Sequence, residues 1–309
     1  MRPGGVAVVA GASGYIGQHL VRTWSGHGAE VRTIGRGPDA DASWGDVEGL
    51  ADVLDGAGLL VNLAGRSVSC RYSKRNVDAI LASRTETTAL LGRALAASPR
   101  PPSLWVNAST ATIYRDARDR PMDEATGEVG AGFSVAVARA WEHELFEAPT
   151  AVRKVALRMA IVLGAGGGAV NPFINLARLG LGGPMGDGGQ MFSWVHVDDV
   201  VRTVDHLADH PGIAGPVNVA APNAVTNAEM VRSVRRAFGR SHGVPLPAWA
   251  LEAGARLIRT EAELVLKSRW VDPAVLRGSG FAFAHPDLDG ALGEIASRTR
   301  RGLLPVALG

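Results

Sequence analysis

The chain has 309 residues, 46% of them hydrophobic, and a formal net charge of +2. A chain of this length buries roughly three quarters of its unfolded surface, so it needs neither disulfides nor a structural metal, and disorder as the dominant state is excluded. The net charge is too small to favour nucleic acid or an anionic membrane as a partner.

The single cysteine, Cys70, excludes an intramolecular disulfide and a cysteine-based metal cluster. The apolar run Val6–Ala10 is too short for a signal peptide, and no run approaches the roughly 18 apolar residues of a membrane-spanning helix. We therefore expect a cytoplasmic protein with a small-molecule substrate. A homodimer is left open.

Short β-branched runs alternate with segments of helical period through the first half of the chain. This pattern is typical of βαβ units and a parallel sheet. After the first strand, Ile16, Leu20, Val21 and Trp24 form one apolar helical stripe. A second helix is expected over 77–97. The expected strands are Val6–Ala10, Glu30–Ile34, Leu59–Leu63, Leu104–Ala108, Val155–Val162 and Gly215–Val219.

A glycine-rich turn follows the first expected strand and precedes the first expected helix. Gly11, Gly14 and Gly17 form a G-x-x-G-x-x-G pattern. Such a turn lets backbone amides approach a pyrophosphate and directs the positive end of a helix at the anion. In this context the pattern predicts a dinucleotide-binding loop, with a turn that binds no ligand as the alternative.

Arg36 stands at the end of the second expected strand, where an NAD-binding fold places Asp or Glu. A guanidinium at this position pairs with a 2′-phosphate, so Arg36 favours NADP(H) over NAD(H) as the cofactor. The alternative is a solvated surface arginine.

The composition changes after Leu163, where glycines surround a short apolar segment. Strand and helix signals return near residue 198, and the prolines beyond residue 241 interrupt them again. We expect an α/β fold, a Rossmann doubly wound parallel sheet with a small C-terminal substrate lobe. The expected parts are a cofactor-binding core (1–163), a glycine-rich substrate or lid segment (164–197), a return to the core (198–240) and a C-terminal lobe (241–309).

Several segments together resemble short-chain dehydrogenase/reductases. More narrowly, the chain resembles their atypical extended group, the nucleoside-diphosphate-sugar epimerase-like "epimerase family", including its additional C-terminal piece of unknown function. The resembling segments are 11–17, 62–65, 82–84, 107–114, 158–164, 180–184, 193–199, 221–227 and 280–288. With the glycine turn and Arg36, the resemblance implies a set of cofactor-binding residues. These are Gly11, Ser13, Gly14, Tyr15, Ile16, Arg36, Asn62, Leu63, Ala64, Gly65, Ala108, Ser109 and Arg158.

The wider superfamily transfers its proton through a Ser or Thr, a Tyr and a Lys. Thr110 matches the hydroxyl position, but the positions that match the tyrosine and the lysine hold Ser134 and Ala138. No lysine lies between Lys74 and Lys154, so a shifted register does not restore the pair. The atypical group generally lacks this pair as well.

Another acid is then required for catalysis, and His196 and Tyr114 are the candidates beside Thr110. Imidazole titrates near physiological pH, and the resemblance places His196 near the substrate pocket. The alternatives are a hydrogen-bonded structural histidine between Val195 and Val197, and a tyrosine that serves packing alone.

Phe192 occupies the position where related nucleotide-sugar enzymes commonly set an arginine for a substrate phosphate. The neighbouring residues are apolar, which argues against a nucleotide-sugar substrate, although ordinary core packing would give the same pattern. The expected substrate-binding residues are Phe133, Met185, Gln190, Phe192 and Trp194. His206 and His210 are expected at a solvated helix end, and no metal is expected.

These observations predict an NADP(H)-dependent oxidoreductase that acts on a small, rather apolar carbonyl, alcohol or enone. Natural-product biosynthesis would suit its departures from the common motifs. Two alternatives stay open: a non-redox epimerase or dehydratase on the same fold, and a non-catalytic NADPH-binding sensor.

Overall fold

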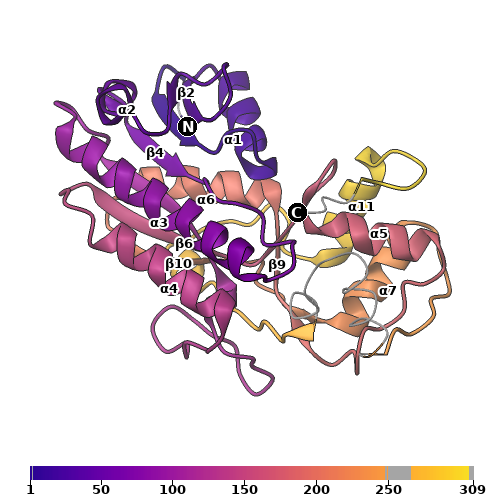
Figure 1. Cartoon of the computed structure of the whole chain (residues 1–309). Coiled ribbons are helices and arrows are strands. Elements are labelled where there is room, and N and C mark those ends of the chain that lie inside the picture. Colours follow the sequence, from indigo (N-terminus) through magenta and orange to yellow (C-terminus); the bar gives the residue numbers. More distant parts are fainter. Residues whose placement is uncertain (2, 248, 250–265, 306–309) are drawn as a thin grey trace.

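A seven-stranded parallel sheet forms the centre of the molecule (Figure 1). The computed structural model describes residues 1, 3–247, 249 and 266–305. The strands lie in the order β10 (Gly215–Val219), β6 (Arg153–Met159), β5 (Leu104–Thr110), β4 (Leu59–Asn62), β1 (Val6–Ala10), β2 (Glu30–Gly35) and β3 (Ala42–Ser43). The order reverses between β1 and β4. In open α/β sheets a ligand binds in the crevice at such a switch point, beyond the carboxyl ends of the strands.

Helices cover both faces of this sheet, and the strands are buried accordingly. In β1, Val9 packs into the hydrophobic core on one face of the sheet, and its neighbour Val8 packs into the core on the opposite face. Both side chains are fully buried. Alternate residues of a strand point to opposite faces, so an unbroken apolar run is what a doubly covered strand requires. On one face lie α1 (Tyr15–Gly26) and α6 (Val197–Asp209). On the other lie α2 (Val47–Leu54), α3 (Lys74–Ala97) and α4 (Phe133–Phe146).

The predicted α/β doubly wound class is confirmed, with one difference within the expected strands. The run expected as a single strand over 155–162 is two strands, since β6 ends at Met159 and β7 (Ile161–Leu163) pairs with β9 (Trp194–His196) in a separate two-stranded sheet. At the break, the Ala160 amide donates to the Val219 carbonyl of β10 (2.9 Å). An apolar run does not reveal such a change of partner.

A second hydrophobic cluster lies beside the sheet, on the right of Figure 1. It is built on α5 (Asn171–Arg178), α7 (Asn227–Ala237) and α11 (Leu288–Arg298), with 3-10 turn η2 (Gly168–Val170), β8 (Met191–Phe192) and β11 (Val225–Thr226) at its edges. Of the segment 198–240, α6 and β10 belong to the sheet and α7 to this cluster. Of the described part of 241–309, α10 (Ala274–Gly278) packs near β10, whereas α11 joins the cluster.

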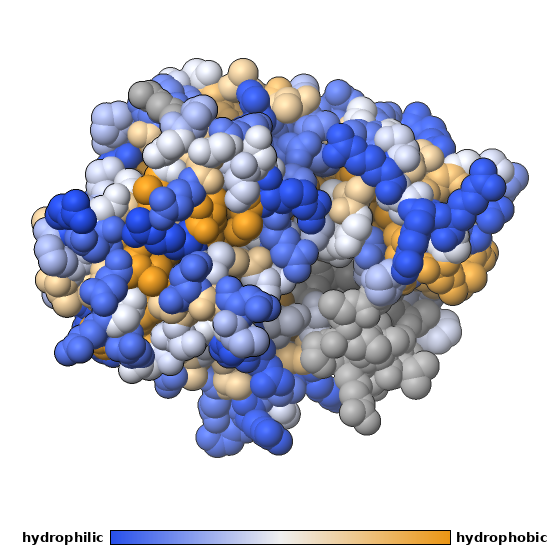
Figure 2. Space-filling view, turned by 90° about the horizontal axis from the view of Figure 1, so that it is seen from above, coloured by the Kyte–Doolittle hydropathy of each residue, from blue (hydrophilic) through white to orange (hydrophobic). Residues whose placement is uncertain are grey.

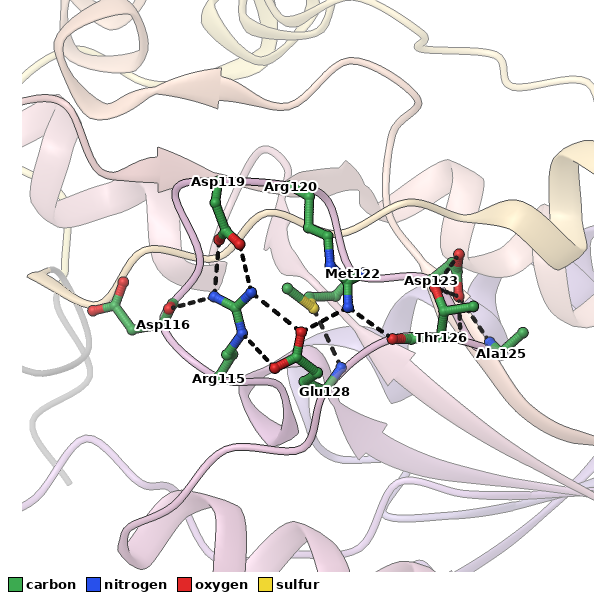
Figure 3. A network of polar contacts seen from close by, with 9 residues as sticks. All are labelled: Arg115, Asp116, Asp119, Arg120, Met122, Asp123, Ala125, Thr126 and Glu128. Carbon is green, nitrogen blue, oxygen red and sulfur yellow. Dashed lines mark hydrogen bonds and ion pairs between the residues drawn. The ribbon is translucent and has the colours of Figure 1, made fainter.

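The loop over 115–128 carries an exposed network of ion pairs (Figure 3). Arg115 binds both Asp119 (Nη2–Oδ2 2.7 Å) and Glu128 (Nε–Oε2 3.1 Å). The hydrogen bonds from Arg115 hold the pKa of the Asp119 carboxyl below its usual range. The Asp272 amide donates to the Met122 carbonyl (2.9 Å), so this loop also anchors the returning C-terminal segment.

Hydrophilic side chains cover most of the face shown in Figure 2, and apolar residues gather there in small patches. None of the helices that the structure describes is both long and apolar enough to span a bilayer.

Candidate functional site

A cavity of about 500 Å³ lies at the carboxyl ends of β1, β4 and β5. It therefore occupies the switch point of the strand order. Its walls come from the glycine turn, the loop after β4, the end of β5 with the turn η1 (Ala111–Ile113), and one face each of α3 and α4. Of the residues expected to bind cofactor or substrate or to act in catalysis, the cavity is lined by Gly11, Gly14, Tyr15, Ile16, Leu63, Gly65, Ala108, Ser109, Thr110 and Phe133.

The three glycines of the turn differ in what the fold requires of them. Gly11 has a φ of +81°, and a Cβ there would lie 2.8 Å from the Leu63 carbonyl carbon. At Gly17 a Cβ would lie 2.8 Å from the Ala12 Cα. At Gly14 the backbone is extended (φ −73°), and the nearest atom would be 3.4 Å away. The fold thus requires Gly11 and Gly17, whereas the missing side chain of Gly14 keeps space open in the cavity.

Gly14 is also the N-cap of α1, and this helix end is free to receive an anion. No side chain caps it, and its first turn holds no acidic residue. The positive end of the helix dipole therefore faces the cavity without an internal negative charge.

Asn62, at the end of β4, shapes the neighbouring loop from beneath. Its Oδ1 accepts the Ala64 amide (3.1 Å), and its Nδ2 donates to Asn107 Oδ1 (2.7 Å) and Thr88 Oγ1 (3.2 Å). Asn62 is fully buried, and it does not line the cavity. It holds the backbone that presents Leu63 and Gly65.

A buried chain of hydrogen bonds runs behind the end of β5. Ser109 Oγ donates to Glu142 Oε1 (2.7 Å), and Glu142 forms an ion pair with Arg158 (Nη2–Oε2 2.7 Å). Arg158 Nη1 donates to the Tyr114 hydroxyl (3.0 Å), which donates to Asn218 Oδ1 (2.9 Å). Burial raises the pKa of the Tyr114 phenol.

This chain contains two residues that the sequence assigned to the site. Tyr114 was expected as a proton donor and Arg158 as a cofactor ligand, but neither lines the cavity. Both are satisfied by protein partners, because a buried guanidinium requires a carboxylate and a buried phenol requires an acceptor.

His196 also lies away from the cavity, at the N-terminus of α6. Its Nδ1 accepts the Asp198 amide (3.3 Å), its Nε2 lies 3.2 Å from Glu294 Oε2, and 2% of the residue is exposed. Burial first, and then the charge of the neighbouring His285, lower the pKa of His196. His196 thus caps α6 and contacts Glu294 of α11.

The same cluster could be mistaken for a metal site. Donor atoms of His196, Asp198 and His285 lie within 4.8 Å of one another. However, Asp198 Oδ1 already forms a hydrogen bond with His19 Nε2 (2.6 Å). His196 Nδ1 already accepts the Asp198 amide at the start of α6. We therefore assign the cluster to the connection between the core and the C-terminal segment.

Four of the five expected substrate residues are buried in the second hydrophobic cluster or its edge, and the cavity does not reach them. Gln190 Nε2 donates to the Met185 carbonyl (2.9 Å), and Trp194 Nε1 donates to that of Asn223 (3.2 Å). Phe192 packs edge-to-face on Phe173. These side chains form a core, which is the alternative that apolar composition left open.

Ser13 and Arg36 are exposed outside the cavity lining. Arg36 follows β2 and makes no hydrogen bond or ion pair with the residues that the structure describes. By contrast, Arg32 Nη1 donates to the carbonyls of Val53 (3.1 Å) and Asp55 (3.0 Å). Of these two arginines, Arg36 is therefore the one whose guanidinium has no partner among the described residues.

The cavity also contains residues that the sequence did not assign to cofactor, substrate or catalysis, and two of them, Ser134 and Ala138, stand at the positions of the superfamily's tyrosine and lysine. Ile80 and Arg84 are one helical turn apart on α3, and their spacing was the available signal. The further residues are Arg66, Ser67, Val68, Ile80, Arg84, Thr112, Ser134, Val137, Ala138, Trp141, Met159, Val162, Gly168 and Ala169.

Tyr15 and the glycine-rich segment meet at the rim of this cavity. Tyr15 donates to the Ala165 carbonyl (3.2 Å), and a Cβ at Gly167 would lie 2.5 Å from its ring. Burial, then the charges of Asp198 and Glu294, raise the pKa of Tyr15 to about 12. The described lining contains no histidine, lysine, cysteine or carboxylate.

Comparisons with known proteins agree with this architecture. The profile of the NAD dependent epimerase/dehydratase family matches residues 7–220, and that of a domain of unknown function, DUF1731, matches residues 246–295. The human epimerase family protein SDR39U1 is 31% identical over 294 residues, which are 94% of this chain and 99% of the relative. YfhF of Bacillus subtilis, also an epimerase family protein, is 28% identical over 300 residues, 93% of this chain and 96% of YfhF.

Among solved structures, the crystal structure of human SDR39U1 (isoform 2) with NADPH superposes with a TM-score of 0.86. Its sequence is 32% identical, and the match covers 94% of this chain and 99% of that one. These matches confirm the resemblance that the sequence motifs indicated.

Proposed function

The chain belongs to the NAD-dependent epimerase/dehydratase family, and from this premise we propose that it is an NADP(H)-dependent oxidoreductase acting on a small, rather apolar carbonyl, alcohol or enone. The observation that carries the proposal is the cavity at the switch point, where Gly14 and the uncapped end of α1 leave room for a pyrophosphate.

The choice of NADP(H) is supported from two sides. Arg36 offers an exposed guanidinium after β2, where a 2′-phosphate would lie. The human relative of known structure was crystallised with NADPH. When bound, NADPH supplies a hydride.

The side chains around the cavity suit an apolar substrate held by a few hydroxyl groups. Ile80, Phe133, Val137 and Trp141 give its walls an apolar character. Close to them, Thr110 Oγ1 donates to Thr112 Oγ1 (3.1 Å).

Thr112 Oγ1 also accepts from Arg269 Nε (3.2 Å). The proton of Thr112 is then available to orient a substrate oxygen, because its lone pairs already accept two hydrogen bonds. With no near-neutral acid in the described lining, the proton that accompanies reduction comes from water through these hydroxyls.

The test combines binding and turnover. Titration of the protein with NADPH and with NADH, followed by cofactor fluorescence, should show tighter binding of NADPH. Consumption of NADPH should then follow the addition of apolar aldehydes, ketones or enones. Equal affinity for both cofactors would contradict the cofactor assignment, and binding without consumption by any of these compounds would contradict the reductase.

The lining itself favours a second candidate, an NADPH-binding sensor without turnover. It lacks a titratable acid or base near neutrality among the residues described. The same absence disfavours a non-redox epimerase or dehydratase, which requires such groups to move protons. Binding without turnover would support the sensor. As part of the oxidoreductase proposal, we propose that the protein acts in natural-product biosynthesis in the cytoplasm. The sequence supports this role through its departures from the common motifs.

A further inference from the structure

A second cavity, of about 400 Å³, opens at the surface of the second hydrophobic cluster, where α5 and α7 end. Both helices lie on the right of Figure 1. None of its described lining residues lines the cavity at the switch point, so the two cavities are separate. Its lining consists of Arg178, Leu179, Phe238, Gly239, Arg240, Arg301, Gly302 and Leu303.

The segment that follows α11 forms one wall of this second cavity, and side chains of α5 hold that segment in place. Asn175 Nδ2 donates to the Leu304 carbonyl (2.9 Å), and Asn175 Oδ1 accepts the Leu304 amide (2.8 Å). One turn further along the helix, Arg178 donates to the carbonyls of Arg300 (2.9 Å) and Gly302. Hydrogen bonds therefore fix this wall against α5.

Three of the lining residues carry a guanidinium group, and none of the described ones carries a carboxylate. The guanidinium carbon of Arg178 lies 5.2 Å from the centre of the Phe238 ring, within reach of a cation–π contact. The side chains of Arg240 and Arg301 are exposed and make no hydrogen bond or ion pair with the described residues. The cavity is therefore positively charged.

The arginines that flank this cavity along the chain are paired, unlike those that line it. Arg236, on α7, donates to both oxygens of Asp289 (3.0 and 2.7 Å). Arg298, on α11, forms an ion pair with Glu294 (Nε–Oε1 2.7 Å). The carboxylates of this part of the surface are thus bound to arginines outside the cavity.

The ends of two helices offset a part of the charge in the cavity. α5 ends at Arg178 and α7 at Ala237, and each helix C-terminus is equivalent to about half a negative charge. The last turn of α7 also holds two basic residues of its own, Arg235 and Arg236. Against the three guanidinium groups of the lining, the two helix ends leave an excess of about two positive charges.

Apolar side chains stand beside these charges. Leu179 and Leu303 both line the cavity, and they are 58% and 59% exposed. Covering exposed leucine side chains with an apolar group is favourable, because it removes apolar surface from water. The lining thus suits a ligand that has both an anionic group and an apolar part.

We propose that this second cavity binds a soluble phosphate monoester with a short aliphatic chain. A phosphate monoester carries about −1.5 to −2 charges near pH 7, which matches the excess positive charge, and it has three oxygens that accept from guanidinium groups. The aliphatic chain would cover Leu179 and Leu303. The proposal is independent of the proposed function, because the two cavities share no described residue.

The experiment compares hexyl phosphate with inorganic phosphate, which lacks the chain, and with hexanoate, which has the chain but a single charge. Isothermal titration calorimetry measures the three compounds on the free protein and on protein saturated with NADPH. We expect hexyl phosphate to bind at least about tenfold more tightly than either of the other two. NADPH should leave its affinity unchanged.

Two substitutions locate the binding site. Arg240→Met and Arg301→Met should each weaken the binding of hexyl phosphate by at least about tenfold, since each removes a charge-assisted hydrogen-bond donor. Arg93→Met is the matched control, because Arg93 is also exposed but lies on α3, outside both linings. It should leave the affinity unchanged, and circular dichroism checks that each variant folds.

Three results would overturn the proposal. If inorganic phosphate or hexanoate binds as tightly as hexyl phosphate, the cavity does not recognise the phosphate and the chain together. If neither Arg240→Met nor Arg301→Met changes the affinity, the compound binds elsewhere. Displacement of hexyl phosphate by NADPH would place it in the cavity at the switch point.

Discussion

Two polar regions of this molecule differ in whether their groups find partners inside the protein. Behind the end of β5, Glu142, Arg158 and Tyr114 satisfy one another in a buried chain. In the cavity in front of it, the uncapped end of α1 and Arg84 have no carboxylate partner among the described residues. The comparison shows that residue types capable of catalysis can be fully bound to protein partners, as Tyr114 is. The candidate cavity differs in that its positive charge has no carboxylate partner among the described residues.

The largest expected effect tests the internal chain. Glu142→Ala leaves Arg158 buried without its carboxylate, and breaking a buried pair from one side costs about 3–5 kcal/mol of folding free energy. Chemical denaturation measures this loss. The exposed pair of Arg118 with Asp187 is the control, and Asp187→Ala should cost less than about 1 kcal/mol. Similar losses in the two variants would remove the distinction between the regions.

Gly14 tests the cavity side of the comparison. Gly14→Val places a branched side chain where the pyrophosphate must approach, so NADPH affinity should fall by about 100-fold or more, while the melting temperature changes little. Gly26→Ala at the other end of α1, where a Cβ meets open space, should retain full affinity. If Gly14→Val still binds NADPH with normal affinity, the cofactor does not bind at the glycine turn.

Arg36 sharpens the assignment of the cofactor. Arg36→Ala should weaken NADPH binding by about tenfold and leave NADH binding unchanged, because only NADPH carries the 2′-phosphate. Fluorescence titration with both cofactors measures this change in preference. An equal loss for NADPH and NADH would show that Arg36 acts on the loop rather than on the phosphate.

The smallest expected effect concerns pH and the cluster around His196. Burial and His285 lower the pKa of folded His196, so the unfolded chain takes up a proton near pH 6.5 that the folded chain does not. The stability that comes from keeping His196 neutral in the folded protein is fully present above the pKa of the unfolded histidine. It is lost as the pH falls below that value. His19, through its hydrogen bond, lowers the pKa of Asp198 to about 2, so the contribution of Asp198 persists to lower pH.

Denaturation between about pH 7 and about pH 5 should therefore show a steeper loss of stability in the wild-type protein than in His196→Gln, whose side chain does not titrate. NADPH affinity should be the same in both proteins. Identical slopes of stability against pH in the two proteins would show that His196 does not contribute to the pH dependence. A fall in NADPH affinity in His196→Gln would indicate that this residue acts on the cofactor site.

The sequence predicted the strands and the glycine turn well, because both depend on local patterns. The alternating runs and G-x-x-G-x-x-G at Gly11–Gly17 are readable from neighbouring residues alone. The catalytic expectations did not transfer in the same way. Whether Tyr114 or His196 faces a ligand depends on partners far along the chain, such as Asn218 and Glu294, and no local pattern reveals them.

The residues of the cavity wall also depend on contacts that no local sequence pattern reveals. Arg84 belongs to a segment that contributed to the family resemblance, yet only the structure shows that it lies on the cavity wall without a carboxylate partner among the described residues. The sequence does not show which side chains lack a partner in the folded structure. In the same way, Met185, Phe192 and Trp194 have the apolar character of a pocket, and only the fold shows that they pack on one another.

The contact between Tyr15 and the glycine-rich segment has a consequence for how this chain can change in evolution. Gly164 and Gly167 leave no room for a side chain as long as an aromatic ring stands at position 15. A smaller residue at position 15 would make room for a side chain at Gly167, whereas a Cβ at Gly164 would still lie 2.7 Å from Val197 Cγ1. Positions 15 and 167 are thus expected to change together, and their contact ties the first helix to a segment about 150 residues later in the chain.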